Sequence, residues 1–202
     1  MRENKIKKLN ILAKTKFLSL YDATYENKNG VNKSWTIASR KSYEVLKEQL
    51  LDKKEDKVDA VVIVAYHKEK DRLVIVKQFR VPINDYIYEL PAGLVDAGED
   101  PIVSVKRELK EETGLDVINI IEGIGRDKVY LSPGMTDESV NLIYCICDGE
   151  LSKDNLEEDE DIEPLLISKE EAKMILESNS KMDIKCLIVL QSFINNGLEF
   201  IK

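Results

Sequence analysis

The sequence predicts an α+β fold, with helices packed on a mixed sheet and a small N-terminal β-hairpin region in front of it. Two observations predict this class. Strand-like apolar runs and helical patterns follow one another without regular alternation from residue 58 onward, and residues 17–38 show a separate strand alternation around a turn. We therefore expect an N-terminal β-rich region at residues 1–57 and a main domain at residues 58–202.

The N-terminal region is predicted to contain one hairpin and one short helix. Residues 17–21 begin a strand, Asn29-Gly30 supplies the turn, and residues 35–38 form the return strand. Residues 42–51 carry apolar side chains at helical spacing. Because a two-stranded hairpin is marginal by itself, we expect it to pack on another surface.

The main domain is predicted to begin with a hairpin and to end with two helices. Strands are expected at residues 58–66, 72–79, 86–90, 116–123, 140–147 and 162–167. Ser168 and Glu171 form a capping box that starts one helix, and residues 183–195 form the last. The apolar positions of this last helix are Ile184, Leu187, Ile188, Leu190, Phe193 and Ile194.

Composition indicates a soluble cytoplasmic protein. A net charge of −8 argues against binding to nucleic acid, which needs a basic surface. The chain shows neither a signal peptide nor an apolar run long enough to span a membrane. Cys145, Cys147 and Cys186 are predicted to be buried reduced thiols, and the single His67 excludes a histidine-rich metal site.

The most informative segment is residues 93–115, GLVDAGEDPIVSVKRELKEETGL. Asp100 is a natural N-cap, Pro101 suits the first helical position, and Gly114 can end the helix in the left-handed conformation. The apolar stripe of this helix consists of Val105 and Leu109 with Ile102.

Three glutamates share the other face of this helix. Glu108, Glu111 and Glu112 stand at i, i+3 and i+4, where like charges repel by roughly 0.2–0.5 kcal/mol per pair. Mg²⁺ relieves such repulsion and prefers carboxylate oxygens, retained waters and substrate phosphates. The pattern therefore predicts a metal-carrying helix, whereas charge composition alone would favour an ordinary solvated helix.

The same segment resembles the Nudix box at every defined position. The matching residues are Gly93, Glu99, Arg107-Glu108-Leu109, Glu111-Glu112 and Gly114-Leu115, separated by five, seven, one and one residues. The resemblance implies a Nudix-type α/β/α sandwich. It also implies a hydrolase dependent on Mg²⁺, with Mn²⁺ as the alternative cation, that cleaves a diphosphate linked to another moiety.

Flanking stretches at residues 78–80, 89–93 and 132–138 resemble the ADP-ribose pyrophosphatase branch of this family. This implies hydrolysis of ADP-ribose to AMP and ribose 5-phosphate by a homodimer whose N-terminal region serves dimerisation and substrate contact. Two alternatives stay open: hydrolysis of another nucleotide, either a nucleoside-diphosphate sugar or an oxidised nucleoside triphosphate, and a sensor that binds ADP-ribose without cleaving it. Loss of box carboxylates would signal the sensor, and none is lost.

The resemblance implies a substrate-binding role for four residues outside the box. Trp35 would stack on adenine, an interaction worth ~1–3 kcal/mol. Arg40 would contact the substrate, and Pro133 would shape the pocket. Arg80, at a strand end, can form bidentate bonds to a phosphate.

It also implies the metal ligands and the catalytic groups. Metal would bind to Glu108, Glu112 and the carbonyl of Ala92, while Glu111 would hold a second ion or bridge. Arg107 would orient carboxylates through an ion pair with Glu99. The general base is expected in the acidic loop at residues 155–162. The best-aligned candidate is Glu160, followed by Glu158.

Overall fold

The structure is a computed structural model that describes residues 5–55, 57–197 and 199, and it divides into two compact units. The first comprises Met1–Asp59 with Lys128–Val140. The second comprises Ala60–Asp127 with Asn141–Lys202. Among the described helices, none has the length and apolar character needed to cross a bilayer.

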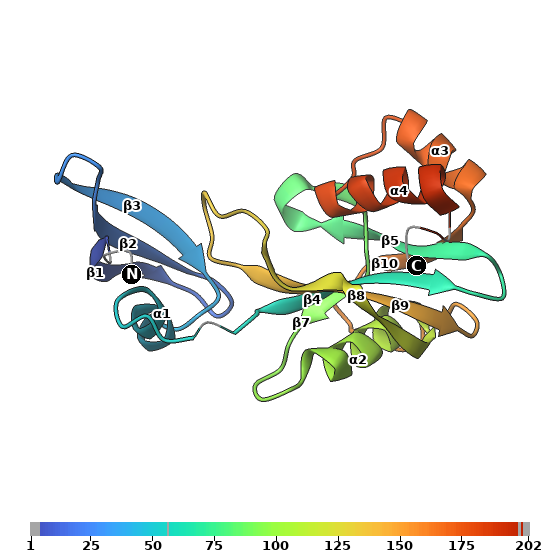
Figure 1. Ribbon diagram of the computed structural model, residues 1–202, viewed down its shortest axis with the longest axis horizontal. Coiled ribbons are helices and arrows are strands. Elements are labelled where there is room, and N and C mark those ends of the chain that lie inside the picture. The colour runs from blue at the N-terminus through green and yellow to red at the C-terminus, as the bar shows by residue number, and fades with distance from the viewer. Residues whose placement is uncertain (1–4, 56, 198, 200–202) are drawn as a thin grey trace. The chain divides into compact units, whose positions relative to one another are not determined.

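The first unit contains a three-stranded antiparallel sheet and one helix (Figure 1). Its elements are β1 (Ile6–Lys14), β2 (Ser19–Glu26), β3 (Asn32–Ser39) and α1 (Tyr43–Leu50). Strands β2 and β3 are the predicted hairpin, with Gly30 at φ +75° in its turn, and α1 is the predicted short helix.

Strand β1 was not predicted, because its sequence IKKLNILAK places only Leu9 in a buried position and lacks a clean alternation. Leu9 packs with Tyr21, Ala23 and Leu46 in a small core of the first unit. The hairpin therefore packs on another surface, as expected, and β1 and α1 supply that surface.

The second unit is built on one large sheet whose strand order is β10-β5-β4-β9-β8, with β6 beside β5 and β7 beside β4. The strands are β4 (Ala60–His67), β5 (Arg72–Arg80), β6 (Asp85–Glu89), β7 (Ala92–Leu94), β8 (Asp116–Tyr130), β9 (Ser139–Asp148) and β10 (Ile162–Ile167). A 3₁₀ turn, Val81–Ile83, joins β5 to β6. The short strand β7 was not predicted.

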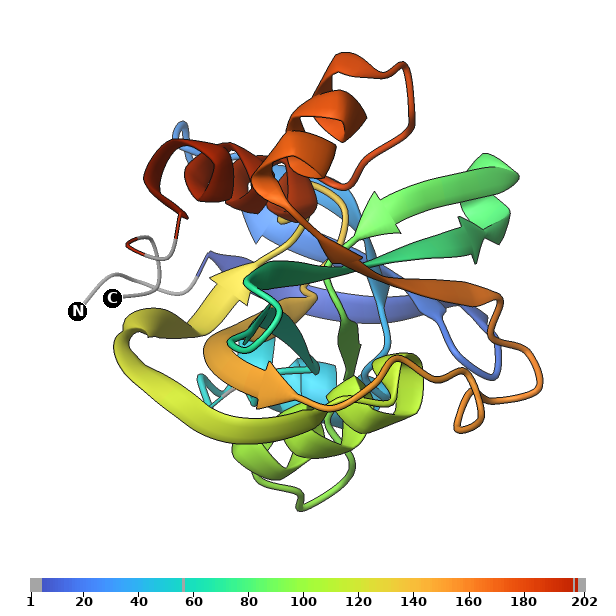
Figure 2. The same ribbon diagram turned by 90° about the vertical axis from the view of Figure 1, so that its right-hand side faces the viewer.

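Helices cover both faces of this sheet (Figure 2). Helix α2 (Pro101–Thr113) lies on one face, and α3 (Lys169–Glu177) with α4 (Ile184–Asn196) lies on the other. Two residues of β4 contact helices on opposite faces of the sheet. Ile63 packs in one core with Leu109 of α2. The ring of Tyr66 lies 6.4 Å from the ring of Phe193 in α4. The predicted α/β/α sandwich is confirmed.

Two predicted apolar faces need correction. Ile102 lies exposed at the start of α2, so only Val105 and Leu109 form the buried stripe. Helix α4 buries a stripe consisting of Cys186, Val189, Leu190 and Phe193. Ile184 and Ile188 are exposed because they lie off that i, i+3, i+4, i+7 stripe, so apolar residue type alone did not identify the packing face.

The only histidine of the chain, His67, is buried at the end of β4. Its Nδ1 accepts a hydrogen bond from the N–H of Lys70 at 3.3 Å. Nε2 must then carry the ring proton, and it lies 2.9 Å from the carbonyl oxygen of Gly149. The imidazole thus ties the β4–β5 turn to the end of β9. Cys145 and Cys147 are buried on one face of β9, as predicted.

Candidate active site

The ends of helix α2 are fixed as the sequence predicts. The carboxylate of Asp100 accepts the N–H of Ile102 at 2.8 Å, and Gly114 ends the helix at φ +77° with its N–H on the carbonyl of Lys110. These caps set which residues occupy each face of the helix. One face of the helix packs on the core through Val105 and Leu109. The same helix carries the glutamates of the box.

Two box glutamates lie buried against the backbone of β7. Glu112 is only 3% exposed, and its carboxylate accepts a hydrogen bond from the N–H of Ala92 at 3.1 Å. Glu108 is also buried, and it lies so close to Gly93 that a Cβ there would stand 1.8 Å from its Cδ. The glycine at position 93 therefore leaves the space that the Glu108 carboxylate fills.

The electrostatics of this pair favour a cation. Burial raises the pKa of Glu112 well above the ordinary value, the N–H of Ala92 opposes this, and the charges of Glu108 and Glu160 raise it further. Burial likewise raises the pKa of Glu108, against the lowering effect of Arg107. Because both carboxylates are desolvated and repel each other, a cation between them would relieve an unfavourable interaction.

Arg107 supplies the positive charge that the structure itself brings to these carboxylates. Its Nη1 donates to Glu108 at 2.6 Å and to Glu111 at 3.1 Å, and its Nη2 donates to Glu99 at 3.0 Å and to the carbonyl of Leu94 at 2.9 Å. The expected ion pair between Arg107 and Glu99 is thus present. Hydrogen bonds from Arg107 and then Ser104 lower the pKa of Glu99 to about 2.

The residues present fit an oxygen-ligated divalent cation. Within the part of the chain that the structure describes, no three His, Cys, Asp or Glu side chains already stand at ligating distance, since Arg107 holds Glu108 and Glu111. The donors are nevertheless hard oxygens, and two of the carboxylates are buried beside a cradle that a Cβ would fill. Such donors suit Mg²⁺ or Mn²⁺.

Arg80 lies at the end of β5 and is engaged by a residue that sequence reasoning missed. Its Nε and Nη2 donate to the two carboxylate oxygens of Glu89 at 3.0 and 2.5 Å. Arg80 also lowers the pKa of Glu112, so its charge acts on the buried carboxylates of α2. Glu89 belongs to the recognised flank of the box, but only the pairing of β5 with β6 shows that its carboxylate orients the arginine.

The acidic loop brings Glu160 near the box. The charge of Glu160 raises the pKa of both Glu108 and Glu112, and its carboxylate accepts the N–H of Glu157 at 3.0 Å. The loop is anchored next to Glu160, because the hydroxyl of Tyr86 donates to the carboxylate of Asp161 and the N–H of Phe79 donates to the Asp161 carbonyl at 3.0 Å. Tyr86 was not among the predicted site residues.

The remaining predicted residues lie together in the first unit. Trp35 is 52% exposed on β3, and its Nε1 donates to the carbonyl of Gly134 at 3.3 Å. The Nε of Arg40 donates to Glu138 at 2.9 Å. Pro133 is exposed in the turn closed by the N–H of Met135 on the carbonyl of Ser132. Trp35, Arg40 and Pro133 thus gather around one segment, residues 131–139.

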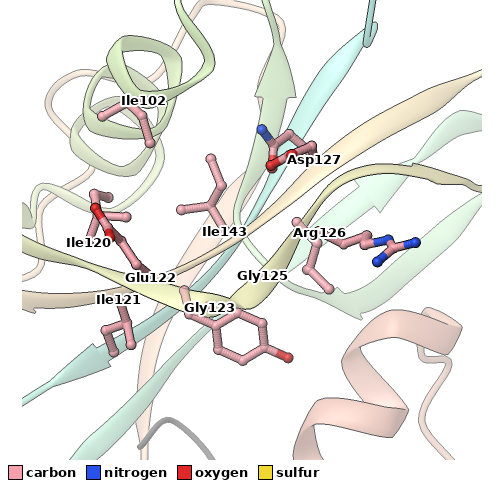
Figure 3. Close-up of a pocket in the computed structure, with 12 residues that line it drawn as sticks. Ile102, Ile120, Ile121, Glu122, Gly123, Gly125, Arg126, Asp127 and Ile143 are labelled. Atoms are coloured by element: carbon pink, nitrogen blue, oxygen red, sulfur yellow. The ribbon is translucent and has the colours of Figure 1, made fainter.

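A cavity of about 260 Å³ lies elsewhere in the second unit, on β8 and β9 beside the first turn of α2 (Figure 3). Gly123 and Gly125 of β8 have no side chain to fill the cavity. Ile102, Ile120 and Ile143 form its apolar wall (Figure 3). None of the box carboxylates lines it. The box carboxylates therefore lie at the α2–β7 face and not in this cavity.

Comparisons with known proteins show the family and the fold. A family model described as the NUDIX domain matches residues 56–185. The ADP-ribose pyrophosphatase of Bacillus subtilis (strain 168) is 35% identical over 65% of this chain and 70% of its own length. The ADP-ribose pyrophosphatase of Saccharomyces cerevisiae is 32% identical over 73% of this chain and 62% of its own. A crystal structure of an ADP compounds hydrolase shares the fold, with a TM-score of 0.70 at 18% identity over 98% of each chain.

Proposed function

Because the chain belongs to the NUDIX family, we propose that it hydrolyses the diphosphate bond of ADP-ribose to AMP and ribose 5-phosphate in the presence of Mg²⁺. The observation that carries the proposal is the buried pair Glu108 and Glu112 against the Ala92–Gly93 backbone. Glu108, Glu112 and the carbonyl of Ala92 would hold the cation, with Glu111 as a further ligand. Bound Mg²⁺ would neutralise the diphosphate and template the attack.

The chain's own residues bind the substrate and accept the proton. A water oxygen attacks one phosphorus of the diphosphate in line, the bond from that phosphorus to the bridging oxygen breaks, and the bridging oxygen leaves on the other phosphate. Glu160 accepts the proton of the attacking water, and its coupling to Glu108 and Glu112 supports that assignment. Glu158 is the second candidate. Arg80 exchanges Glu89 for phosphate oxygens, and Arg107 orients the box carboxylates.

The choice of ADP-ribose is supported by the first unit and by the names of the relatives. Both relatives described above are named ADP-ribose pyrophosphatases. The half-exposed indole of Trp35 offers a face for adenine, and Arg40 and Pro133 lie beside it. A homodimer in the cytoplasm, in which the first unit serves dimerisation and substrate contact, completes the proposal. Light scattering at micromolar concentration tests the dimer.

A substrate panel with Mg²⁺ tests the function, with phosphate products separated by chromatography. ADP-ribose should give the highest kcat/KM among ADP-ribose, ADP-glucose, GDP-mannose, NADH and 8-oxo-dGTP. A tenfold preference for GDP-mannose or 8-oxo-dGTP would show that the substrate is wrong while the hydrolase stands. Tight binding of ADP-ribose without turnover of any compound would identify a sensor. Trp35→Ala should raise KM for ADP-ribose and leave kcat nearly intact, because the base is remote from the reacting phosphorus.

A further inference from the structure

A nearly buried cluster of three charged side chains lies in the first unit, outside the box. The Nζ of Lys41 donates to both carboxylate oxygens of Asp59, at 2.8 and 3.1 Å, and to Asp137 at 2.9 Å. The side chains of Lys41, Asp59 and Asp137 are 10%, 10% and 11% exposed. Burial lowers the pKa of Lys41, but the hydrogen bonds and charges of Asp59 and Asp137 outweigh it and raise the pKa above the ordinary value.

This cluster joins the chain after β3 to the segment that carries Pro133. Asp59 also accepts the backbone N–H of Ser139 at 2.9 Å, while Asp137 belongs to the same segment, residues 131–139. Lys41 follows directly on Arg40. The cluster thus connects the backbone next to Arg40 with residues 137–139.

The segment so held is the one on which the proposed substrate residues rest. The carbonyl of Gly134 accepts the indole N–H of Trp35, and the carboxylate of Glu138 accepts the guanidinium of Arg40. The N–H of Ala38 on β3 donates to the carbonyl of Met135 at 2.9 Å. A shift of residues 131–139 would therefore move the hydrogen-bond partners of Trp35 and Arg40 together.

An ordinary stabilising role does not require this composition. Two carboxylates compete for one ammonium in a nearly dry site, and an ion pair of this kind is often no more stabilising than well-packed apolar side chains. What it does supply is a single geometry, since the ammonium must satisfy carboxylates that come from two separate parts of the chain. A requirement for a fixed segment explains the cluster better than a requirement for stability.

We propose that Lys41, Asp59 and Asp137 form an ionic clamp that positions residues 131–139 and thereby sets the orientation of Trp35 and Arg40 toward the adenosine end of the substrate. The three are positioning residues that determine specificity. The substrate consequence rests on the proposed function, whereas the positioning of Trp35 does not.

The test uses Trp35, the only tryptophan of the chain, as its own reporter. Asp137→Asn keeps the shape of the side chain, leaves Lys41 paired with Asp59, and weakens the tie to the segment. Lys41→Met removes the ammonium at similar length. The matched control is Lys54→Met, which makes the same change at an exposed ion pair with Glu48, where the side chains are 61% and 47% exposed. Tryptophan emission, acrylamide quenching, melting temperature and kinetics with ADP-ribose are measured on each full-length variant.

Both clamp variants should shift the emission of Trp35 and increase its quenching, and should raise KM about 3- to 10-fold with kcat changed less than about twofold, the signature of lost binding without lost chemistry. Lys54→Met should match the wild type throughout. Unaltered emission and KM in Asp137→Asn, with or without a lower melting temperature, would overturn the clamp, and this variant decides the matter if Lys41→Met fails to fold. Should the wild type not hydrolyse ADP-ribose, altered emission in the variants would still support the positioning role while the proposed function falls.

Discussion

The backbone of Gly93 leaves no room for a side chain beside Glu108, because a Cβ on residue 93 would lie 1.8 Å from the carboxyl carbon of Glu108. Residue 93 sits in β7 and residue 108 in α2, so the contact joins two elements across the face where the metal is proposed to bind. Strand and helix are matched at the level of a single methyl group.

Gly93→Ala should separate folding from catalysis. The atoms that the new methyl group meets belong to the end of a flexible side chain, so Glu108 can swing aside and the fold should persist. Its carboxylate would then leave the metal face, and we expect activity to fall about 10–100-fold, the scale reported for displaced metal-site groups. Activity is measured against Mg²⁺ concentration and the fold by circular dichroism. A folded variant within twofold of wild-type activity would contradict the proposed ligand geometry.

Metal removal and Glu112→Gln should have the same consequence. EDTA should abolish hydrolysis and added Mg²⁺ should restore it. Glu112→Gln keeps the shape of the buried side chain but loses its charge, so we expect kcat to fall at least ~10²-fold, the scale of a lost electrostatic group. Glu122→Gln, at an exposed glutamate of β8, is the control and should be neutral. Full turnover in EDTA would contradict the prediction that hydrolysis depends on a metal ion.

Tyr86→Phe tests the anchoring of the loop that carries Glu160. The variant removes the hydroxyl that donates to Asp161 while keeping the ring, which packs edge-on against Phe79 with centroids 5.6 Å apart. We expect kcat to fall about 2- to 10-fold, as for one net hydrogen bond, with KM nearly unchanged. Steady-state kinetics with Tyr88→Phe on the same strand provides the comparison. Equal effects of the two substitutions would count against a specific anchor.

The buried thiols should make stability fall at alkaline pH. Burial raises the pKa of Cys147 and of Cys186 to about 12 and that of Cys145 further, whereas an unfolded thiol ionises near ~8.5. A folded-state pKa above the unfolded value contributes stability that is complete below about pH 8.5 and is lost as pH rises toward 12. Urea titrations at pH 8 and pH 10 should show the loss, and Cys186→Ala should reduce its slope. A thiol reagent should leave the cysteines of the folded protein unlabelled and should label them once the protein is unfolded.

Local signals predicted most of this fold. The caps of α2 at Asp100 and Gly114, the capping box at Ser168 and the strand β10 lie where the sequence placed them, because each depends on residues close together in the chain. Strand β1 was not predicted because its sequence contains several charged residues and only one leucine that is buried.

The site was predictable only where the box itself encodes it. Glu108 and Glu112 share a face through helical spacing, which a sequence shows directly. The bidentate pairing of Arg80 with Glu89 depends on how β5 and β6 pair, and the cluster around Lys41 depends on distant segments meeting. Contacts of that kind arise from the register of strands and the path of loops, which carry no mark in the residue types.

The burial of His67 decides how a pH–rate profile of this enzyme would be interpreted. Both ring nitrogens of the only imidazole in the chain are engaged with the backbone at Lys70 and Gly149, so this side chain is not placed to act as an acid or base in the reaction. An inflection in such a profile would then report a carboxyl group, and burial raises the pKa of both Glu112 and Glu108 above the ordinary value. The midpoint of such a curve would then slide with magnesium concentration, because proton and cation compete for the same oxygens.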